Sequence, residues 1–227
     1  MIIIGHRGAA GHLPENTLPS FQKALDFGVP MIELDVYSVE GKLMVIHDDR
    51  VDRTTDGEGY VSDLSVDELR KLDAGDSAKI PFLEEVLDLI DRKCAVNVEL
   101  KGENTAEPVA QMIAEYVGEK NWKHDDFLVS SFNHPELALF QKHNADVPVG
   151  ALIEAIPIDY ARFAADLGAK FLNCSVDFVN QKFVDDAHAR GLEVLVYTVN
   201  HPDDFARMKA LGVDGVFSNY PDRGNDL

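Results

Sequence analysis

Short runs of branched apolar residues alternate with longer amphipathic stretches along all 227 residues, and this alternation most constrains the fold. Apolar positions recur with helical spacing in the longer stretches, as in residues 17–27 and 203–211. Regular alternation of strands and helices is typical of an α/β fold around a parallel sheet. The strand candidates are residues 2–5, 31–37, 94–100, 127–131, 147–152, 170–174, 193–198 and 213–217.

Helix ends are marked by residues that suit them. Glycine follows four candidate helices, where a left-handed C-cap is common, at Gly28, Gly168, Gly191 and Gly212. Residues that can cap helix N-termini are Asn16 or Thr17, Asn133 and Asn200. Eight strands with intervening helices in fewer than about 250 residues predict a closed (β/α)8 TIM barrel. A doubly wound sheet is the rival, but no Gly-x-Gly-x-x-Gly motif follows the first strand.

One polar segment, residues 48–79, is too long for an ordinary barrel connection and is expected to be an insertion after the second strand. Within it, Ser65 and Glu68 have the spacing of a capping box. Pro81 then opens a helix that continues through Ile90. Because no linker or repeat divides the chain, residues 1–227 are expected to form a single domain.

The chain is strongly acidic, with 21 Lys and Arg against 40 Asp and Glu and a formal net charge of −19. Such a charge disfavours nucleic acid and stable association with anionic membranes. No apolar run approaches the roughly 20 residues of a bilayer span, and Met1–Ile4 shows no basic leader, so a cytoplasmic location is expected. Cys94 and Cys174 fit neither a metal spacing nor a disulfide framework and are expected to be buried free thiols.

Three acidic residues lie late in candidate strands, at the end where barrel enzymes place their active sites. Glu33 and Asp35 are two positions apart, so they point the same way about 6.6 Å from each other, and Glu99 occupies a similar place in a later strand. Converging carboxylates without a counter-ion would raise one another's pKa. An oxygen-only ligand set suits Mg²⁺ or Ca²⁺, with Mn²⁺ as a further alternative. A solvated acidic rim is the competing interpretation.

Two histidines and two basic residues accompany these acids. His6 and His47 could exchange protons at neutral pH on opposite sides of an in-line displacement, although a strand-end histidine can also be structural. Arg7 and Lys101 supply the local positive charge that a phosphate ligand needs in an acidic protein. With a divalent cation, the balance suits a singly charged phosphodiester. The two bases could instead simply neutralise the neighbouring acids.

Two aromatic residues are candidates for the wall of a pocket. Phe132 follows the fourth strand and Tyr197 lies in the seventh, counted along the chain. Both could flank a bound substrate on its apolar side, or both could pack in the core.

Several short motifs follow one another through nearly the whole chain, and their order and number are specific. They are Gly5-His6-Arg7-Gly8, Glu15-Asn16-Thr17, Ile32-Glu33-Leu34-Asp35-Val36, Val45-Ile46-His47-Asp48, Arg53-Thr54-Thr55, Val98-Glu99-Leu100-Lys101 and Thr198-Val199-Asn200. In this combination the sequence closely resembles the glycerophosphodiester phosphodiesterase family.

The resemblance implies a (β/α)8 barrel that hydrolyses glycerophosphodiesters to an alcohol and sn-glycerol 3-phosphate with a divalent cation. The matched positions are the acid and base pair His6 and His47, the metal ligands Glu33, Asp35 and Glu99, and the phosphate-binding residues Arg7 and Lys101. The segment 48–79 matches a small subdomain over the pocket. Phe82, Tyr197 and Asn219 depart from the commoner pattern, and none of the three is expected to touch the chemistry.

Two other functions stay open at this point. One is a lysolipid phosphodiesterase similar to sphingomyelinase D, which shares the barrel and the histidine pair. The other is a non-catalytic barrel that binds glycerol phosphodiesters. In each case the expected partner is a small molecule, and a homo-oligomer is left open.

Overall fold

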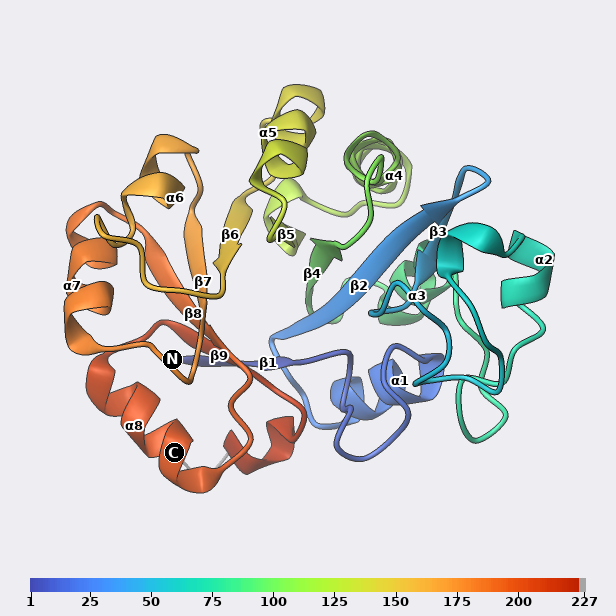
Figure 1. Ribbon diagram of the computed structural model, residues 1–227, viewed down its shortest axis with the longest axis horizontal. Coiled ribbons are helices and arrows are strands. Elements are labelled where there is room, and N and C mark those ends of the chain that lie inside the picture. Colours follow the sequence, from blue (N-terminus) through green and yellow to red (C-terminus); the bar gives the residue numbers. More distant parts are fainter. Residues whose placement is uncertain (225–227) are drawn as a thin grey trace.

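Eight parallel strands close into a barrel in the computed structural model, which describes residues 1–224 (Figure 1). The strands follow the order β1-β9-β8-β7-β6-β5-β4-β2, and pairing of β1 with β2 completes the ring. The predicted TIM barrel is therefore confirmed. The barrel strands are β1 (Ile2–Gly5), β2 (Met31–Val39), β4 (Ala95–Leu100), β5 (Phe127–Ser131), β6 (Val149–Ile153), β7 (Phe171–Ser175), β8 (Glu193–Tyr197) and β9 (Gly215–Ser218).

Helices follow the strands and ring the barrel on its outside, as Figure 1 shows. All four glycines expected to end helices have positive φ, and Gly212, with φ of 75°, is the left-handed C-cap of the last helix. The helices are α1 (Leu18–Asp26), α2 (Val66–Leu69), α3 (Leu83–Ile90), α4 (Ala106–Glu119), α5 (His134–His143), α6 (Arg162–Asp166), α7 (Gln181–Ala189) and α8 (Pro202–Leu211).

The predicted N-caps are right at two helices and wrong at a third. Thr17 and Asn133 accept hydrogen bonds from backbone N–H groups at the starts of α1 and α5. At α8 the cap is His201 rather than Asn200. The side chain of Asn200 accepts instead from the backbone N–H of Asn219, at 2.9 Å, in the loop after β9. Asn200, the residue that the local sequence favours as the cap, therefore makes a tertiary hydrogen bond instead.

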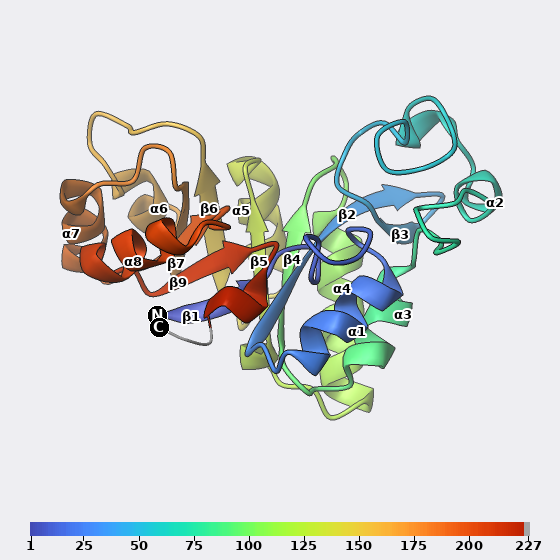
Figure 2. The same cartoon turned by 90° about the horizontal axis from the view of Figure 1, so that it is seen from below.

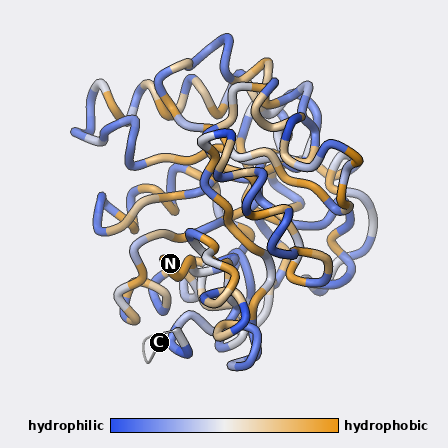
Figure 3. The backbone as a smooth tube through the Cα atoms, turned by 90° about the vertical axis from the view of Figure 1, so that its left-hand side faces the viewer, coloured by the Kyte–Doolittle hydropathy of each residue, from blue (hydrophilic) through white to orange (hydrophobic). Residues whose placement is uncertain are grey.

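The interior of the barrel is apolar at one end and polar at the other. A cluster of buried side chains from five strands fills the apolar end, namely Ile4, Leu128, Phe171, Leu195 and Phe217. The larger hydrophobic clusters lie between the strands and the helices. Figure 3 shows this pattern as hydrophobic stretches separated by hydrophilic turns. Polar residues that point inward at the other end are therefore held on a packed, rigid base.

A ninth strand, β3 (Lys42–Val45), is absent from the predicted set. Strand β2 extends to Val39 and turns through Glu40 and Gly41, both with positive φ, and β3 returns antiparallel beside it. A two-residue turn with both central φ values positive is the usual connection of a tight hairpin. The dipeptide Glu40-Gly41 is a weak signal for such a turn, because non-glycine residues rarely adopt positive φ.

The polar segment after this hairpin packs around an apolar cluster of its own, which also takes in Val39, Met44 and Ile46 from the hairpin and its end. Its short helix α2 begins with the expected capping box between Ser65 and Glu68. In Figure 2 the segment lies at the end of the barrel toward which β2 and β4 run. The segment therefore stands beside the mouth where the polar residues gather. The assignment of residues 1–227 to one domain stays a prediction.

Two further features bear on where the chain can act. Within residues 1–224, no helix is both long and apolar enough to cross a bilayer. Cys94 and Cys174 are free and buried, as expected, and burial raises the pKa of each thiol to about 12.

A buried carboxylate on α5 joins two neighbouring helices, and its removal tests how much this contact stabilises the helical layer. Glu136 accepts hydrogen bonds from the backbone N–H groups of Thr105 and Ala106 at the start of α4, both at 2.9 Å. We expect Glu136→Ala to lower the free energy of unfolding by about 2 kcal/mol, because two buried donors lose their acceptor. Urea denaturation measures the change. Glu136→Gln keeps one acceptor oxygen and should lose less; an equal loss in both variants would contradict this account.

Candidate active site

The carboxyl ends of the barrel strands surround a cavity of about 280 Å³. Of the nine site residues expected from the sequence, eight line it: His6, Arg7, Glu33, His47, Glu99, Lys101, Phe132 and Tyr197. The ninth, Asp35, is fully buried, with one carboxylate oxygen 3.5 Å from Nε of Arg7. Residues far apart in the sequence are therefore brought to one place.

Three carboxylates form the centre of this site. Glu33, Asp35 and Glu99 are 2%, 0% and 8% exposed, and a carboxylate oxygen from each lies within 4.8 Å of the others. Burial, followed by the charge of Asp35, raises the pKa of Glu33 well above its usual value and that of Glu99 to about 7. Such a cluster is stable only with bound protons or a bound cation.

The acids are oriented by hydrogen bonds that each occupy one oxygen. The backbone N–H of Arg7 donates to Oε2 of Glu33 at 2.8 Å, and Lys101 donates to Oε1 of Glu99 at 2.9 Å. Nδ2 of Asn16 donates to Oδ2 of Asp35 at 2.9 Å. Oε1 of Glu33 and Oδ1 of Asp35 are buried and have no protein partner. An oxygen-only donor set with oriented, unpartnered oxygens fits a hard divalent cation.

The loop after β1 holds Arg7 in an unusual conformation. Arg7 has φ of 52°, which costs a non-glycine residue about 1 kcal/mol, and this turn aims its N–H at Glu33. Gly8 follows with φ of 85°, and a Cβ there would lie 2.6 Å from the backbone of Ser20. The hydroxyl of Ser20 donates to the carbonyl of Arg7 at 2.9 Å. Close packing on α1 therefore fixes the loop.

The two histidines are both held through Nδ1. His6 Nδ1 lies 2.6 Å from Oδ1 of Asn219, and His47 Nδ1 lies 2.6 Å from Oδ1 of Asp48. Nζ of Lys101 is 3.2 Å from Nε2 of His47. Burial, and then the charge of Arg7, lowers the pKa of His6 to about 4; burial also lowers the pKa of His47. Both shifts favour the neutral imidazole, which is the form that accepts a proton.

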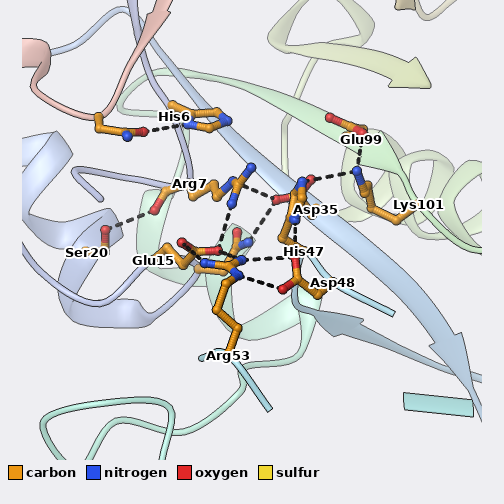
Figure 4. A network of polar contacts seen from close by, with 12 residues as sticks. His6, Arg7, Glu15, Ser20, Asp35, His47, Asp48, Arg53, Glu99 and Lys101 are labelled. Atoms are coloured by element: carbon orange, nitrogen blue, oxygen red, sulfur yellow. Dashed lines mark hydrogen bonds and ion pairs between the residues drawn. The ribbon is translucent and has the colours of Figure 1, made fainter. Parts of the chain in front are cut away.

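An ion-pair cluster joins the inserted segment to both sides of the site (Figure 4). Arg53 donates to both oxygens of Asp48, at 2.6 and 3.0 Å, and to both oxygens of Glu15, at 2.9 and 2.7 Å. Asp48 contacts His47, and Glu15 accepts from Nη1 of Arg7 at 2.8 Å. One guanidinium thereby links the residues that orient His47 and Arg7.

An aromatic pair also lines the cavity. Rings of Phe132 and Tyr197 meet edge to face with centroids 5.8 Å apart. The hydroxyl of Tyr197 donates to the carbonyl of Ile153 at 2.7 Å, and Phe132 is 38% exposed. Neither ring is packed wholly in the core, so the pair forms an apolar wall.

Several contacting residues received no role from the sequence. Asn16, Glu15 and Arg53 stand in motifs near the catalytic candidates, and Asp48 directly follows His47, so adjacency to those motifs was the available signal. The expectation that Asn219 avoids the chemistry is wrong, because it contacts His6 across the closure of the barrel. Residues 213 positions apart meet there only because β1 pairs with β9.

Comparison with known proteins gives a decisive match. Residues 6–223 match the model of the glycerophosphoryl diester phosphodiesterase family. The chain belongs to this family. A glycerophosphodiester phosphodiesterase of Bacillus altitudinis is 35% identical over 97% of this chain and 95% of its own length. Its counterpart in Caldanaerobacter subterraneus is 33% identical over 97% and 95% of the two chains. The family and the enzyme class expected from the sequence, a phosphoric diester hydrolase, are confirmed.

A solved structure of the family supports the same conclusion. An Oleispira antarctica phosphodiesterase, determined in complex with the product sn-glycerol-3-phosphate, superposes with a TM-score of 0.91. It is 31% identical in sequence, and the match covers 100% of this chain and 96% of that one.

The Arg53 cluster should make stability depend on pH. Burial would raise the pKa of Glu15, but hydrogen bonds from Arg53 and the charge of Arg7 outweigh it and lower that pKa from 4.5 to about 2. The pKa of Asp48 is lowered mainly by its hydrogen bond from Arg53. A lowered pKa contributes stability above the unfolded value and loses it as the pH falls. We therefore expect Arg53→Met to destabilise the protein most above about pH 5.

Urea denaturation from about pH 7 to pH 2 measures this difference, which should shrink toward the acid end as the two carboxyls are protonated. Arg50→Met is the matched control, because Arg50 lies on the same segment but contacts the exposed Asp52 and the ring of Tyr60 rather than Glu15 or Asp48. A pH-independent effect of Arg53→Met would contradict the assignment.

Proposed function

We propose that this protein hydrolyses glycerophosphodiesters to an alcohol and sn-glycerol 3-phosphate, with His6 and His47 as acid and base. The observation that carries the proposal is one cavity lined by two imidazoles and two basic side chains beside a cluster of three buried acids. The product in the related Oleispira antarctica structure supports the choice of substrate class.

Arg7 and Lys101 are the proposed phosphate-binding residues. Both line the cavity, and nearby carboxylates raise the pKa of each side chain despite burial, so both stay charged at neutral pH. Within residues 1–224, Nε of Arg7 makes no hydrogen bond, although Oδ2 of Asp35 lies 3.5 Å away as its ion-pair partner. Charge that gathers on the equatorial oxygens in the transition state would be stabilised by the two cations.

Proton transfer is assigned to the two histidines. Each ring is anchored through Nδ1, by Asn219 at His6 and by Asp48 at His47, so that Nε2 is the atom for the substrate; at His47 a substrate atom would replace Nζ of Lys101, which lies 3.2 Å from Nε2. One neutral imidazole would deprotonate the attacking hydroxyl or water. The other must be an imidazolium in the enzyme–substrate complex, where the negative phosphate favours the protonated ring, and would give its proton to the leaving alkoxide. Asp48, itself held by Arg53, would stabilise the imidazolium that forms on His47.

Glu33, Asp35 and Glu99 are the proposed ligands of one divalent cation, Mg²⁺, Ca²⁺ or Mn²⁺. When bound, such an ion supplies Lewis-acid charge that polarises a phosphoryl oxygen and acidifies the attacking hydroxyl or water. The three carboxylates would hold the ion, and the hydrogen bonds from Arg7 to Glu33 and from Lys101 to Glu99 orient two of them.

Phe132 and Tyr197 would contact the substrate on its apolar side.

Two alternative functions remain, a lysolipid phosphodiesterase and a non-catalytic barrel that binds glycerol phosphodiesters. Release of glycerol 3-phosphate from glycerophosphocholine, compared with a lysophospholipid, separates all three. The cytoplasmic location and a homo-oligomer stay predictions.

Each histidine should be required for turnover. We expect His6→Ala and His47→Ala to lower the turnover of glycerophosphocholine by about 10² to 10⁴-fold, because each removes one proton transfer. A coupled assay for glycerol 3-phosphate measures the rate, and circular dichroism checks the fold. His143→Ala, at the exposed end of α5, is the control and should keep full activity. Wild-type turnover in His6→Ala would refute the assignment.

Metal binding should be detectable both in an activity assay and in a thermal melt, which does not depend on turnover. EDTA should abolish turnover, and Mg²⁺, Mn²⁺ or Ca²⁺ should restore it. The same ions should raise the thermal midpoint of the wild type, because they bind the folded state and relieve repulsion among the acids. The exposed Glu193→Gln should respond like the wild type, whereas Asp35→Asn should not. Full activity in a demonstrably metal-free preparation would be incompatible with this proposal.

A further inference from the structure

Three buried polar side chains lie at the floor of the cavity or directly behind it. Asn97 on β4, Ser130 on β5 and Asn173 on β7 are each at most 1% exposed, and the first two line the cavity. Within residues 1–224, Oδ1 of Asn97, Oγ of Ser130 and both amide atoms of Asn173 have no hydrogen-bond partner. We call these three residues the polar floor. Buried polar groups are normally paired, so this concentration points to a missing partner.

Ser130 and Asn173 are neighbours inside the barrel. Ser130 lies beside Gly150 in the register of β5 and β6. A Cβ on Gly150 would come within 3.0 Å of Nδ2 and 3.1 Å of Oδ1 of Asn173, so the amide of Asn173 extends across the bare backbone of β6. Because β6 contributes no side chain at this level, the amide of Asn173 can lie beside Ser130.

Two of the three residues of the polar floor line the cavity of the proposed active site, and Asn173 lies behind them. Asn97 and Ser130 both line that cavity together with His6 and Lys101. Asn97 precedes Glu99 by two residues on β4, so it lies one step deeper in the barrel on the same face. The apolar cluster of Ile4 and Leu128 is buried inside the same barrel. A group that enters the polar floor must therefore come through the active-site mouth.

The chemistry of the polar floor selects its ligand. Its amide and hydroxyl groups are neutral and offer both donors and acceptors. Phosphate would be drawn instead to the charged groups of Arg7 and Lys101 nearer the mouth. A hydroxyl group, which donates and accepts one hydrogen bond each, is the small neutral partner that matches this set.

On the basis of the function proposed above, we propose that the polar floor binds the terminal hydroxyl of the glyceryl group and so selects glycerol-headed diesters. That hydroxyl is the one farthest along the glyceryl chain from the phosphorus. Asn97 and Ser130, which line the cavity, contact it, and the amide of Asn173 beside Gly150 extends the set of hydrogen-bonding groups. A site built to bind a substrate hydroxyl rejects an analogue without it, because the buried polar groups are then left unpaired.

The test compares two diesters in two proteins. Glycerophosphocholine and its analogue without the terminal hydroxyl, 2-hydroxypropyl phosphocholine, are assayed with the wild type and Ser130→Ala. We expect the wild type to prefer glycerophosphocholine by about 10-fold or more in kcat/KM. Ser130→Ala should lose about 10-fold on glycerophosphocholine and less than about 3-fold on the analogue.

The neighbouring serine provides the matched control. Ser131 donates to the carbonyl of Leu100 at 2.6 Å and takes no part in the polar floor. Ser131→Ala should keep the substrate preference even if its stability falls. Ser130→Ala removes an unpartnered hydroxyl and should stay folded in a thermal melt.

Equal losses of Ser130→Ala on both diesters would mean that the polar floor holds only a water molecule, and would overturn the proposal. Absence of any preference in the wild type would overturn it equally. Binding of glycerol 3-phosphate and of its analogue without the terminal hydroxyl, measured by calorimetry, repeats the comparison without turnover. A binding preference in a protein that hydrolyses neither diester would support the polar floor while the proposed function fails.

Discussion

The structure depends on the burial of three carboxylates at one end of a hydrophobic barrel. Glu33, Asp35 and Glu99 repel one another in a setting that water screens poorly, and the pKa values of Glu33 and Glu99 are raised first by burial and then by the charge of Asp35. Burying three like charges destabilises the folded state unless positive charge is bound close to them. The bases Arg7 and Lys101 supply some of that charge, and an oxygen-bound divalent cation would supply the rest.

The inserted segment contributes to the same balance. Through Arg53 it contacts Asp48, which anchors His47, and Glu15, which anchors Arg7. The segment is therefore more than a cover at the mouth of the barrel, because it orients one proposed proton carrier and one proposed phosphate ligand. Its own apolar cluster gives it the rigidity that such positioning requires.

Much of this arrangement could be predicted from the sequence, because it follows from short-range rules. Strand alternation placed Glu33 and Asp35 on one face, and helix-ending glycines such as Gly212 marked the barrel units. The parts that could not be predicted depend on tertiary contacts. Asn219 reaches His6 only when the barrel closes, and β3 forms only because β2 is extended beyond the barrel.

The polar floor is a second feature that could not be predicted from the sequence. Nothing in the local sequence of Ser130 or Asn173 distinguishes them from ordinary strand residues, and their lack of partners appears only when burial and register are known. Sequence patterns thus identified the charged chemistry of the site, whereas its neutral hydrogen-bonding surface became visible only in three dimensions.

The most direct test of the central claim is anomalous diffraction from crystals grown with Mn²⁺ and glycerol 3-phosphate. The account predicts one strong peak bound by oxygens of Glu33, Asp35 and Glu99, with the phosphorus atom lying between the rings of His6 and His47. An ordered product beside three carboxylates that hold no metal ion would contradict it.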